Sequence, residues 1–104
     1  MTDSYKIAHT EKNGEVNLVF SGQLTINNIE KIAAEVKEIL EKPAAVNIQV
    51  KEVENLDLTF VQLIYSIKNS GKKNNFKVTL SVSLSEELNS LVANAGFDSF
   101  LTEN

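Results

Sequence analysis

The sequence predicts one α/β domain, α+β-like in character, that spans residues 1–104 and contains a mixed sheet of four to five strands. Strand-like segments of period two alternate along the chain with helix-like segments of period 3.6. The first two strand-like segments are joined by Asn13-Gly14, which is typical of a two-residue antiparallel hairpin. The strand-like segments alternate apolar with polar residues, whereas strands covered by helices on both faces are apolar throughout. We therefore expect the order ββαβαβα, with a short further strand at the end, and helices on one face of the sheet only.

The N-terminal hairpin is the first element. Tyr5 and Ile7 alternate with polar residues before the Asn-Gly turn, and residues 16–20 alternate after it. Asn and Gly both tolerate the positive φ that a type I′ turn requires. The two segments are therefore expected to pair in an antiparallel sense.

The first helix is expected to begin at Thr25, a residue type that caps helix N-termini, and to end before Pro43. Its apolar residues recur at spacings of three and four, which gives an amphipathic helix one buried face. These residues are Ile26, Ile29, Ile32, Ala33, Val36, Ile39 and Leu40. Residues 46–50 then alternate as a third strand.

The second half of the chain contains two more helices and a fourth strand. The second helix is expected to begin at Asp57, a good N-cap residue, and to end at Gly71. Residues 76–82 alternate as a strand, and residues 83–86 fit a capping box that starts a third helix ending at Gly96. Phe100 and Leu101 are expected to form the short final strand.

The alternation also predicts which strand residues face water. With helices on one face only, the apolar set points into the core, as for Ile48 and Leu80. The polar set is expected to be exposed to solvent: Asn47, Gln49, Thr79 and Ser81.

The composition excludes several classes of function. The net charge is −4 and all ten positive residues are lysines, so a general nucleic-acid binder, which relies on arginine, is not expected. The absence of cysteine excludes disulfides, thiolate catalysis and Cys-zinc sites, and the single His9 cannot form a His-rich metal site. No signal-peptide pattern and no apolar run near ~20 residues occurs, so a cytoplasmic chain without membrane insertion is expected. Without a nucleophile elbow, a phosphate-binding loop or GxGxxG, we expect a non-enzymatic protein with no cofactor.

An acidic cluster follows the third strand. Glu52, Glu54 and Asp57 lie near the end of that strand, where α/β sheets often place ligands. Three carboxylates could hold Mg²⁺, and Asp57 could be the phosphoacceptor of a receiver-like domain. The acidic pair and the late lysine that a receiver domain needs are not recognisable in this order of elements. A helix cap with solvated charges is therefore the favoured interpretation, and no metal is expected.

The second helix carries the clearest candidate for a binding surface. By helical spacing its core face consists of Phe60, Leu63, Ile64 and Ile67. Leu58 and Tyr65 fall almost opposite that face, with Val61 at the flank and Gln62 beside them. A helix that covers one face of a sheet is normally polar on its outer side, so these side chains indicate a surface where a partner protein docks.

Three segments stand out along the predicted element order: residues 53–64 (Val-Glu-Asn-Leu-Asp-Leu-Thr-Phe-Val-Gln-Leu-Ile), Gly22-Gln23-Leu24-Thr25 before the first helix, and residues 83–97 with their Gly-hydrophobic end. Together with the element order, they resemble the STAS domain, the family of anti-sigma factor antagonists. The resemblance covers nearly the whole chain. It rests on the order of these short motifs more than on any one of them.

The resemblance implies a site at the start of the second helix. In the family a partner serine kinase phosphorylates the first hydroxyl residue of an Asp-Ser-(Ser/Thr)-Gly segment, and the added charge releases the antagonist. Here Asp57 matches the aspartate and Thr59 the second hydroxyl residue, whereas Leu58 replaces the phosphoacceptor and Phe60 the glycine. The standard serine switch is therefore not expected, and Thr59 is the nearby candidate phosphoacceptor. The partner-binding residues implied are Asp57, Leu58, Thr59, Val61, Gln62 and Tyr65.

The family resemblance also implies the class of partner. The leading hypothesis is a bacterial transcription regulator that works by partner switching, with an anti-sigma factor or a serine kinase-like protein as its partner. The alternative is a cytoplasmic STAS subunit of a lipid-transport ABC complex, whose permanent partner would be an ATPase. The receiver-like interpretation of Asp57 is a distant third.

Overall fold

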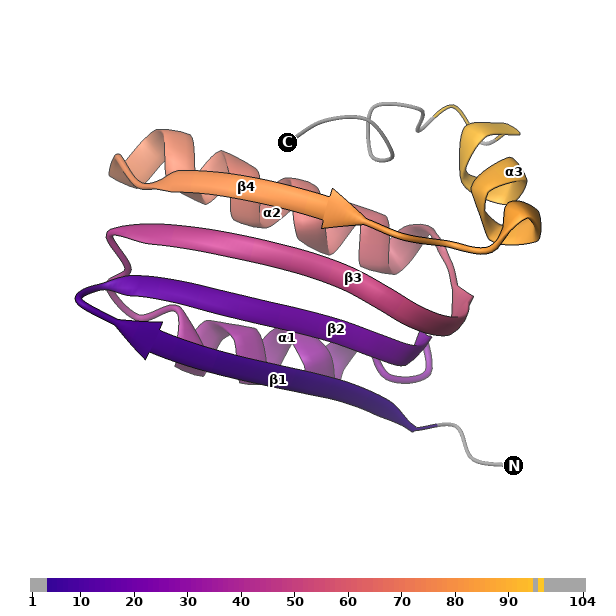
Figure 1. Cartoon of the computed structure of the whole chain (residues 1–104), viewed down its shortest axis with the longest axis horizontal. Helices are drawn as coiled ribbons and strands as arrows, with labels where there is room; N and C mark the ends of the chain where they lie inside the picture. The colour runs from indigo at the N-terminus through magenta and orange to yellow at the C-terminus, as the bar shows by residue number, and fades with distance from the viewer. Residues whose placement is uncertain (1–3, 95, 97–104) are drawn as a thin grey trace.

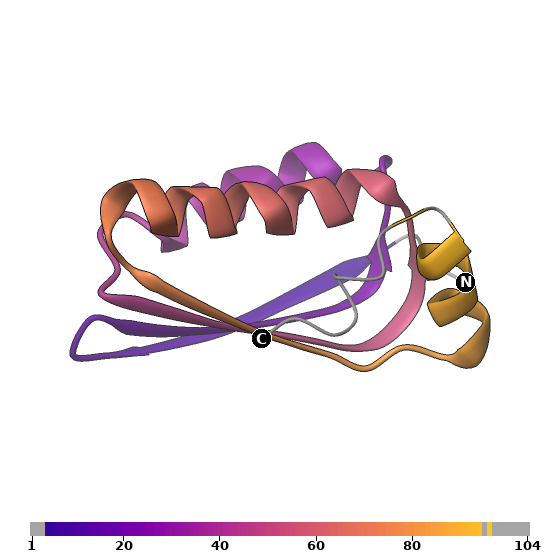
Figure 2. The ribbon, with the colours of Figure 1, turned by 90° about the horizontal axis from the view of Figure 1, so that it is seen from above.

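The chain folds into one mixed sheet with its two longest helices side by side on one face (Figures 1 and 2). The computed structural model describes residues 4–94 and residue 96. Its elements are β1 (Tyr5–Lys12), β2 (Glu15–Leu24), α1 (Ile29–Ile39), β3 (Ala45–Leu56), α2 (Leu58–Asn74), β4 (Lys77–Val82) and α3 (Glu86–Asn94). The predicted order ββαβαβα is confirmed. The strand expected at Phe100 and Leu101 lies outside the described residues.

The sheet has the order β1-β2-β3-β4, with β1 antiparallel to β2 and the other neighbours parallel. Lys12 pairs with Glu15 across the hairpin, which leaves two turn residues. These are Asn13 with φ 54° and Gly14 with φ 84°, the pair of positive φ angles that a type I′ turn requires. The predicted hairpin is therefore confirmed.

The core lies between the sheet and the α1–α2 layer. Leu18, Phe20 and Ile48 point from the strands to meet Phe60 and Ile64 of α2, and all five are almost completely buried. The rings of Phe20 and Phe60 pack edge to face, with centroids 5.2 Å apart. This arrangement suits aromatic pairs, whose ring edges and faces carry opposite partial charges.

The other face of the sheet has no helix over it in the part of the chain that the structure describes (Figure 2). Gln49 and Ser81 are exposed there as predicted, whereas Asn47 and Thr79, also predicted to be exposed, are half-buried, and their side chains bond to one another. Ile48 is buried from the opposite side of β3. The predicted one-sided sheet is confirmed, and this polar surface of β1–β4 is named the open face.

The first helix begins later than its sequence pattern predicts. It starts at Ile29 with Asn28 as the N-cap, rather than at Thr25. Thr25 is buried and its carbonyl oxygen accepts from the Asn28 N–H at 2.9 Å, while the Asn28 side chain donates to the Gln23 carbonyl at 3.0 Å. Residues 25–28 therefore form a turn, and Ile26 lies outside the buried stripe of the helix.

The second helix continues past its predicted end. Gly71 lies inside α2, which runs to Asn74 and is terminated by Asn75 in the left-handed conformation (φ 62°). A Cβ atom at Gly71 would lie 2.7 Å from the Phe76 carbonyl oxygen and 2.8 Å from Val78 Cγ2. The glycine therefore allows α2 to pass close to the start of β4, and it does not stop the helix.

Two polar contacts complete the frame. The Oγ of Ser85 accepts from the Leu88 N–H at 3.2 Å and so caps α3. The capping-box pattern predicts Ser83 as the cap, so the observed cap lies two residues later. The Tyr5 phenol donates to the Glu35 carboxylate and so joins β1 to α1. This hydrogen bond, with smaller effects of burial and of the Glu35 charge, raises the pKa of Tyr5.

Candidate functional site

The start of α2 meets the turn before α1 at the carboxyl ends of β2 and β3 (Figure 1). Residues 25–28 supply the turn, and residues 57–62 supply the N-cap and first turn of the helix. Together these two segments are named the Asp57 corner. The corner contains five of the six residues predicted to bind a partner.

The irregular end of β3 brings Asp57 to this position. The register between β2 and β3 shifts twice, between Phe20 and Gly22 and between Gly22 and Gln23. Each shift gives β3 one extra residue, and Glu52 takes a left-handed φ of 51° within that stretch. Such bulges bend a strand and redirect the residues that follow. Beyond them, the Asp57 N–H donates to the Leu24 carbonyl at 3.2 Å.

The Asp57 carboxylate is the centre of the corner. Its Oδ1 accepts from the Thr59 N–H at 3.0 Å and also from the Thr59 hydroxyl, which caps α2. Its Oδ2 accepts from the Ile26 N–H at 2.7 Å, a bond between segments 31 residues apart in the sequence. The two carboxylate oxygens therefore have separate structural roles, since one caps the helix and the other fixes the turn.

The acidic cluster of Glu52, Glu54 and Asp57 does not gather around a common point. Glu54 Oε1 accepts from the Gln23 side-chain amide at 3.1 Å, and both oxygens of Asp57 accept from N–H or O–H groups of this chain. Among the described residues, no three His, Cys, Asp or Glu side chains are grouped so that they could hold a metal ion. Asp57 acts in this structure as a helix cap.

Four of the predicted partner-binding residues are accessible at the corner. Leu58 is 40% exposed and Gln62 is exposed, while Asp57 and Thr59 are half-buried and bond to one another. Leu58 occupies the first position of α2, and its side chain extends to solvent beside the capping group. The Asp57 cap fixes the start of the helix that carries this accessible apolar side chain.

Val61 and Tyr65 differ from their predicted positions. Val61 is fully buried, because it lies about 60° around the helix from Ile64 and joins the same core stripe. Tyr65 is half-buried and packs against the core, and the Lys68 ammonium lies 5.8 Å from the centre of its ring. The prediction that Val61 lies at the exposed flank and Tyr65 opposite the core is therefore wrong, because Val61 belongs to the core and Tyr65 to its margin.

Sequence reasoning missed the exposed position of Ile26 at the Asp57 corner. Its spacing from Ile29 and Ile32 assigns it to the buried stripe of the first helix, yet its side chain is 64% exposed. The signal that could have placed it correctly is Asn27-Asn28, because asparagine favours turns and helix caps over helix interiors. The Ile26 N–H bonds to the Asp57 carboxylate, and Leu58 is the residue that follows Asp57 in the chain.

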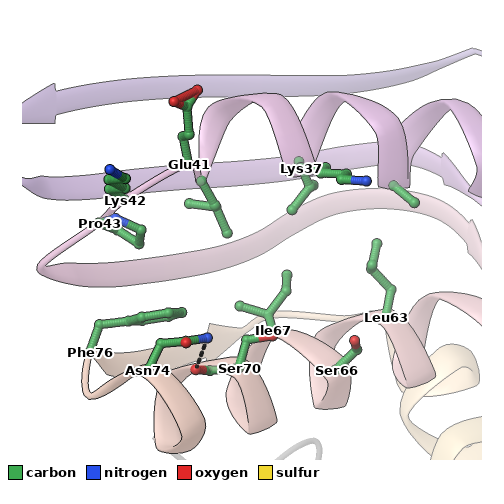
Figure 3. Close-up of a pocket in the computed structure, with 13 residues that line it drawn as sticks. Lys37, Glu41, Lys42, Pro43, Leu63, Ser66, Ile67, Ser70, Asn74 and Phe76 are labelled. Atoms are coloured by element: carbon green, nitrogen blue, oxygen red, sulfur yellow. Dashed lines mark hydrogen bonds between the residues drawn. The ribbon is translucent and has the colours of Figure 1, made fainter.

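A hollow lies between α1 and α2, toward the C-terminal ends of both helices (Figure 3). It has a volume of about 670 Å³ and is lined by both apolar and polar side chains, with Val36, Ile67 and Phe76 among the apolar ones. Lys37 and Lys42 contribute to its rim from the α1 side. None of the predicted site residues lines this groove, so it is separate from the Asp57 corner.

The comparison with protein families gives one result. The family model described as STAS domain matches residues 6–104, which is nearly the whole chain. No curated protein sequence matches the chain. Within the described residues, no helix has both the length and the apolar character needed to cross a membrane.

Proposed function

The chain belongs to the STAS domain family, and on this premise we propose that it is a non-enzymatic regulatory module that binds a partner protein through the Asp57 corner. The observation that carries the proposal is the outward position of Leu58 and Ile26, 40% and 64% exposed, above polar groups that bond inward. Protein interfaces derive most of their binding energy from a few such anchors at the centre of a contact. The exposed polar groups around them would form the rim.

The proposed partner is a protein of the kind that anti-sigma factor antagonists bind: an anti-sigma factor or a serine kinase-like protein in the bacterial cytoplasm. Partner switching in transcription regulation is the corresponding cellular role. A STAS subunit of a lipid-transport ABC complex is the alternative, and it would present the same corner to an ATPase. Family membership is compatible with both, since STAS domains serve regulatory and transport assemblies.

We propose further that docking at the corner does not depend on the standard serine switch. Leu58 occupies the position of the family's phosphoacceptor and has no hydroxyl. The hydroxyl of Thr59 donates to the Asp57 carboxylate, so a phosphate there would lose this bond and lie against a like charge. An apolar Leu58 makes the contact constitutive, and Thr59 is the residue that would carry a phosphate if the partner were a kinase.

Affinity purification of the tagged full-length chain from its native cells, followed by mass spectrometry, tests the class of partner. An anti-sigma factor or a kinase-like protein supports the proposed regulator, and an ABC ATPase supports the alternative. Recovery of neither class, with the chain folded and abundant, would contradict both. Intact-mass analysis after incubation with the partner and ATP then tests Thr59: we expect no added phosphate, or one that Thr59→Val removes.

A further inference from the structure

The strand β1 forms one edge of the sheet, and its outer side pairs with no other strand in the part of the chain that the structure describes. It pairs with β2 over residues 5–12 without a register shift, so its backbone is regular along its whole length. Edge strands are normally protected against further pairing by prolines, bulges, short length or charged side chains. β1 has no proline and no bulge, and Lys6 is the only Asp, Glu, Lys or Arg among residues 4–10. This part of the edge is therefore open to a further strand.

The register of the hairpin identifies which backbone groups of β1 point outward. Lys12 and Glu15 close the two-residue turn and so form a hydrogen-bonded pair, and such pairs recur at every second residue of an antiparallel ladder. The even-numbered residues therefore bond to β2, in agreement with the Ser4 carbonyl, which accepts from the Gln23 N–H at 3.0 Å. The outward N–H and C=O groups belong to the odd-numbered residues Tyr5, Ile7, His9 and Glu11.

We propose that β1 pairs with β1 of a second copy of this chain, antiparallel and about a twofold axis at Ile7, so that the two sheets join into one. In this register Ile7 lies opposite Ile7 of the second copy, and Tyr5 lies opposite His9. Lys6 lies opposite Ala8. Residues whose backbone groups point outward then exchange two N–H···O bonds with the residue opposite. Both sides of the pair keep their faces, so the helices of both copies cover the same side of the joined sheet.

The side chains of β1 are self-complementary in this register. On the helix side, Tyr5 and Ile7 are half-buried and pack against the core, and pairing about Ile7 brings the two apolar margins together. On the open face, the small Ala8 leaves room for the stem of Lys6 to lie across it. The two Lys6 side chains are diagonal neighbours about 7–8 Å apart on an exposed surface, where their ammonium groups can extend away from each other.

The neighbouring registers are less favourable, because like charges opposite one another destabilise a strand pair. Shifting the axis by one residue toward the hairpin would place Glu11 opposite Tyr5, whose phenol already donates to the Glu35 carboxylate. Shifting it by one residue the other way would place Lys6 directly opposite Lys6 of the second copy. The proposed axis avoids both contacts and leaves the charged end of β1 unpaired.

The other edge of the sheet is less suited to joining two copies. β4 has six residues against the eight of β1, and α3 lies on the β4 side of the sheet, away from β1 (Figure 1). A dimer through β1 carries two Asp57 corners at opposite ends of the joined sheet, because the two copies run antiparallel. The inference goes beyond the proposed function and does not depend on it, since β1 lies outside that corner.

The first test uses the wild-type chain alone. In sedimentation equilibrium we expect the mass to rise from one chain to two between about 10 μM and about 1 mM, the range in which small interfaces associate. In amide hydrogen exchange we expect the outward Ile7 and His9 N–H groups to exchange about fivefold more slowly at the higher concentration. A chain that stays monomeric, that forms assemblies larger than a dimer, or whose Ile7 and His9 amides exchange equally fast at both concentrations would overturn the proposal.

The second test compares two variants of His9. His9→Pro removes an outward N–H and leaves the bonds of β1 to β2 in place, since proline is tolerated where the N–H of an edge strand faces solvent. We expect His9→Pro to be monomeric over the same concentrations, and His9→Ala, which keeps the N–H, to dimerise as the wild type does. Thermal melts at low concentration check that both variants fold. A His9→Pro chain that still dimerises, or that loses its fold while His9→Ala keeps it, would overturn the assignment of this N–H to the outer edge and the proposal with it.

The third test locates the twofold axis. The chain contains no cysteine, so a single introduced cysteine reports on one contact. The Cα atoms of a hydrogen-bonded antiparallel pair lie about 5.5 Å apart, within the span of a disulfide. Under mild oxidation we expect Ile7→Cys to form a covalent dimer and Ser81→Cys, on the open face of β4, to remain monomeric. Failure of Ile7→Cys to cross-link, or equal cross-linking of both variants, would overturn the axis at Ile7.

Discussion

The open face of the sheet and the Asp57 corner are both exposed, but they use their polar groups in opposite ways. On the open face, polar side chains bond to one another across strands: Thr79 donates to Asn47 at 2.6 Å, and Asn47 donates to Asn17 at 3.0 Å. At the corner, Asp57 bonds to the backbone N–H groups of Ile26 and Thr59, and the exposed side chains include the apolar Ile26 and Leu58 as well as the polar Asn27 and Gln62. Exposure alone therefore does not identify a binding surface. The corner is distinguished by apolar side chains held on a hydrogen-bonded frame.

The largest predicted effect separates the core side of β3 from the open face. Ile48→Ala is expected to lower the free energy of unfolding by about 2–5 kcal/mol, because it leaves a cavity beneath the helices. Gln49→Ala, one residue away and exposed, is expected to change it by less than about 0.5 kcal/mol. Urea denaturation of both variants measures this difference. Equal losses would show that both faces of the sheet are packed.

The next prediction concerns the stability contributed by Tyr65, which lies between the Asp57 corner and the core. Tyr65→Ala is expected to lower the free energy of unfolding by about 2 kcal/mol, less than for a fully buried aromatic residue, since its ring is only half-buried. Tyr65→Phe keeps the ring against the core and against Lys68, and is expected to be close to neutral. Thermal melts compare the two variants. If Tyr65→Ala is as stable as the wild type, Tyr65 does not contribute to the core and would again be assigned to the docking surface.

A third prediction compares one added charge at the two exposed surfaces. Leu58→Asp is expected to weaken partner binding at least tenfold, about 1.4 kcal/mol, because a carboxylate would replace an apolar side chain in the partner's pocket. Its melting temperature is expected to change little, since an acidic residue is favourable in the first turn of a helix. Ser81→Asp places the same charge on the open face and is expected to leave binding unchanged. Calorimetric titration with the purified partner measures both.

The smallest effect tests the bonds of the open face. Asn47 bonds to Glu15, Asn17 and Thr79, yet Asn47→Ala is expected to cost only about 1 kcal/mol of stability, because water can replace the lost partners on an open surface. Binding is expected to be unaffected. Chemical denaturation and the same titration check the two statements. A loss of binding in Asn47→Ala would assign the partner to the open face.

The sequence predicts the parts of this fold that depend on local chemistry. The hairpin follows from the φ angles that Asn13 and Gly14 tolerate, and the one-sided sheet follows from the alternation of strand residues such as Ile48 and Gln49. The Asp57 cap follows in the same way, since its bond to Thr59 spans two residues.

The parts that sequence reasoning misses depend on contacts between distant segments. Gly71 resembles a helix terminus, but its role is set by the approach of Phe76 and Val78. Ile26 fits a helical stripe, but its place in the 25–28 turn and its bond to Asp57 hold it at the surface. Spacing along one helix also could not show that its buried stripe is wide enough to include Val61.

Amide chemical-shift mapping tests the central claim most directly. The isotope-labelled full-length chain would be titrated with the partner protein recovered from its native cells, and the perturbed amides assigned. We expect the largest changes in residues 25–28 and 57–62, and little change in residues 47–49 and 79–81 of the open face. Changes concentrated on the open face, with residues 25–28 and 57–62 unmoved, would contradict the assignment of the Asp57 corner as the docking surface.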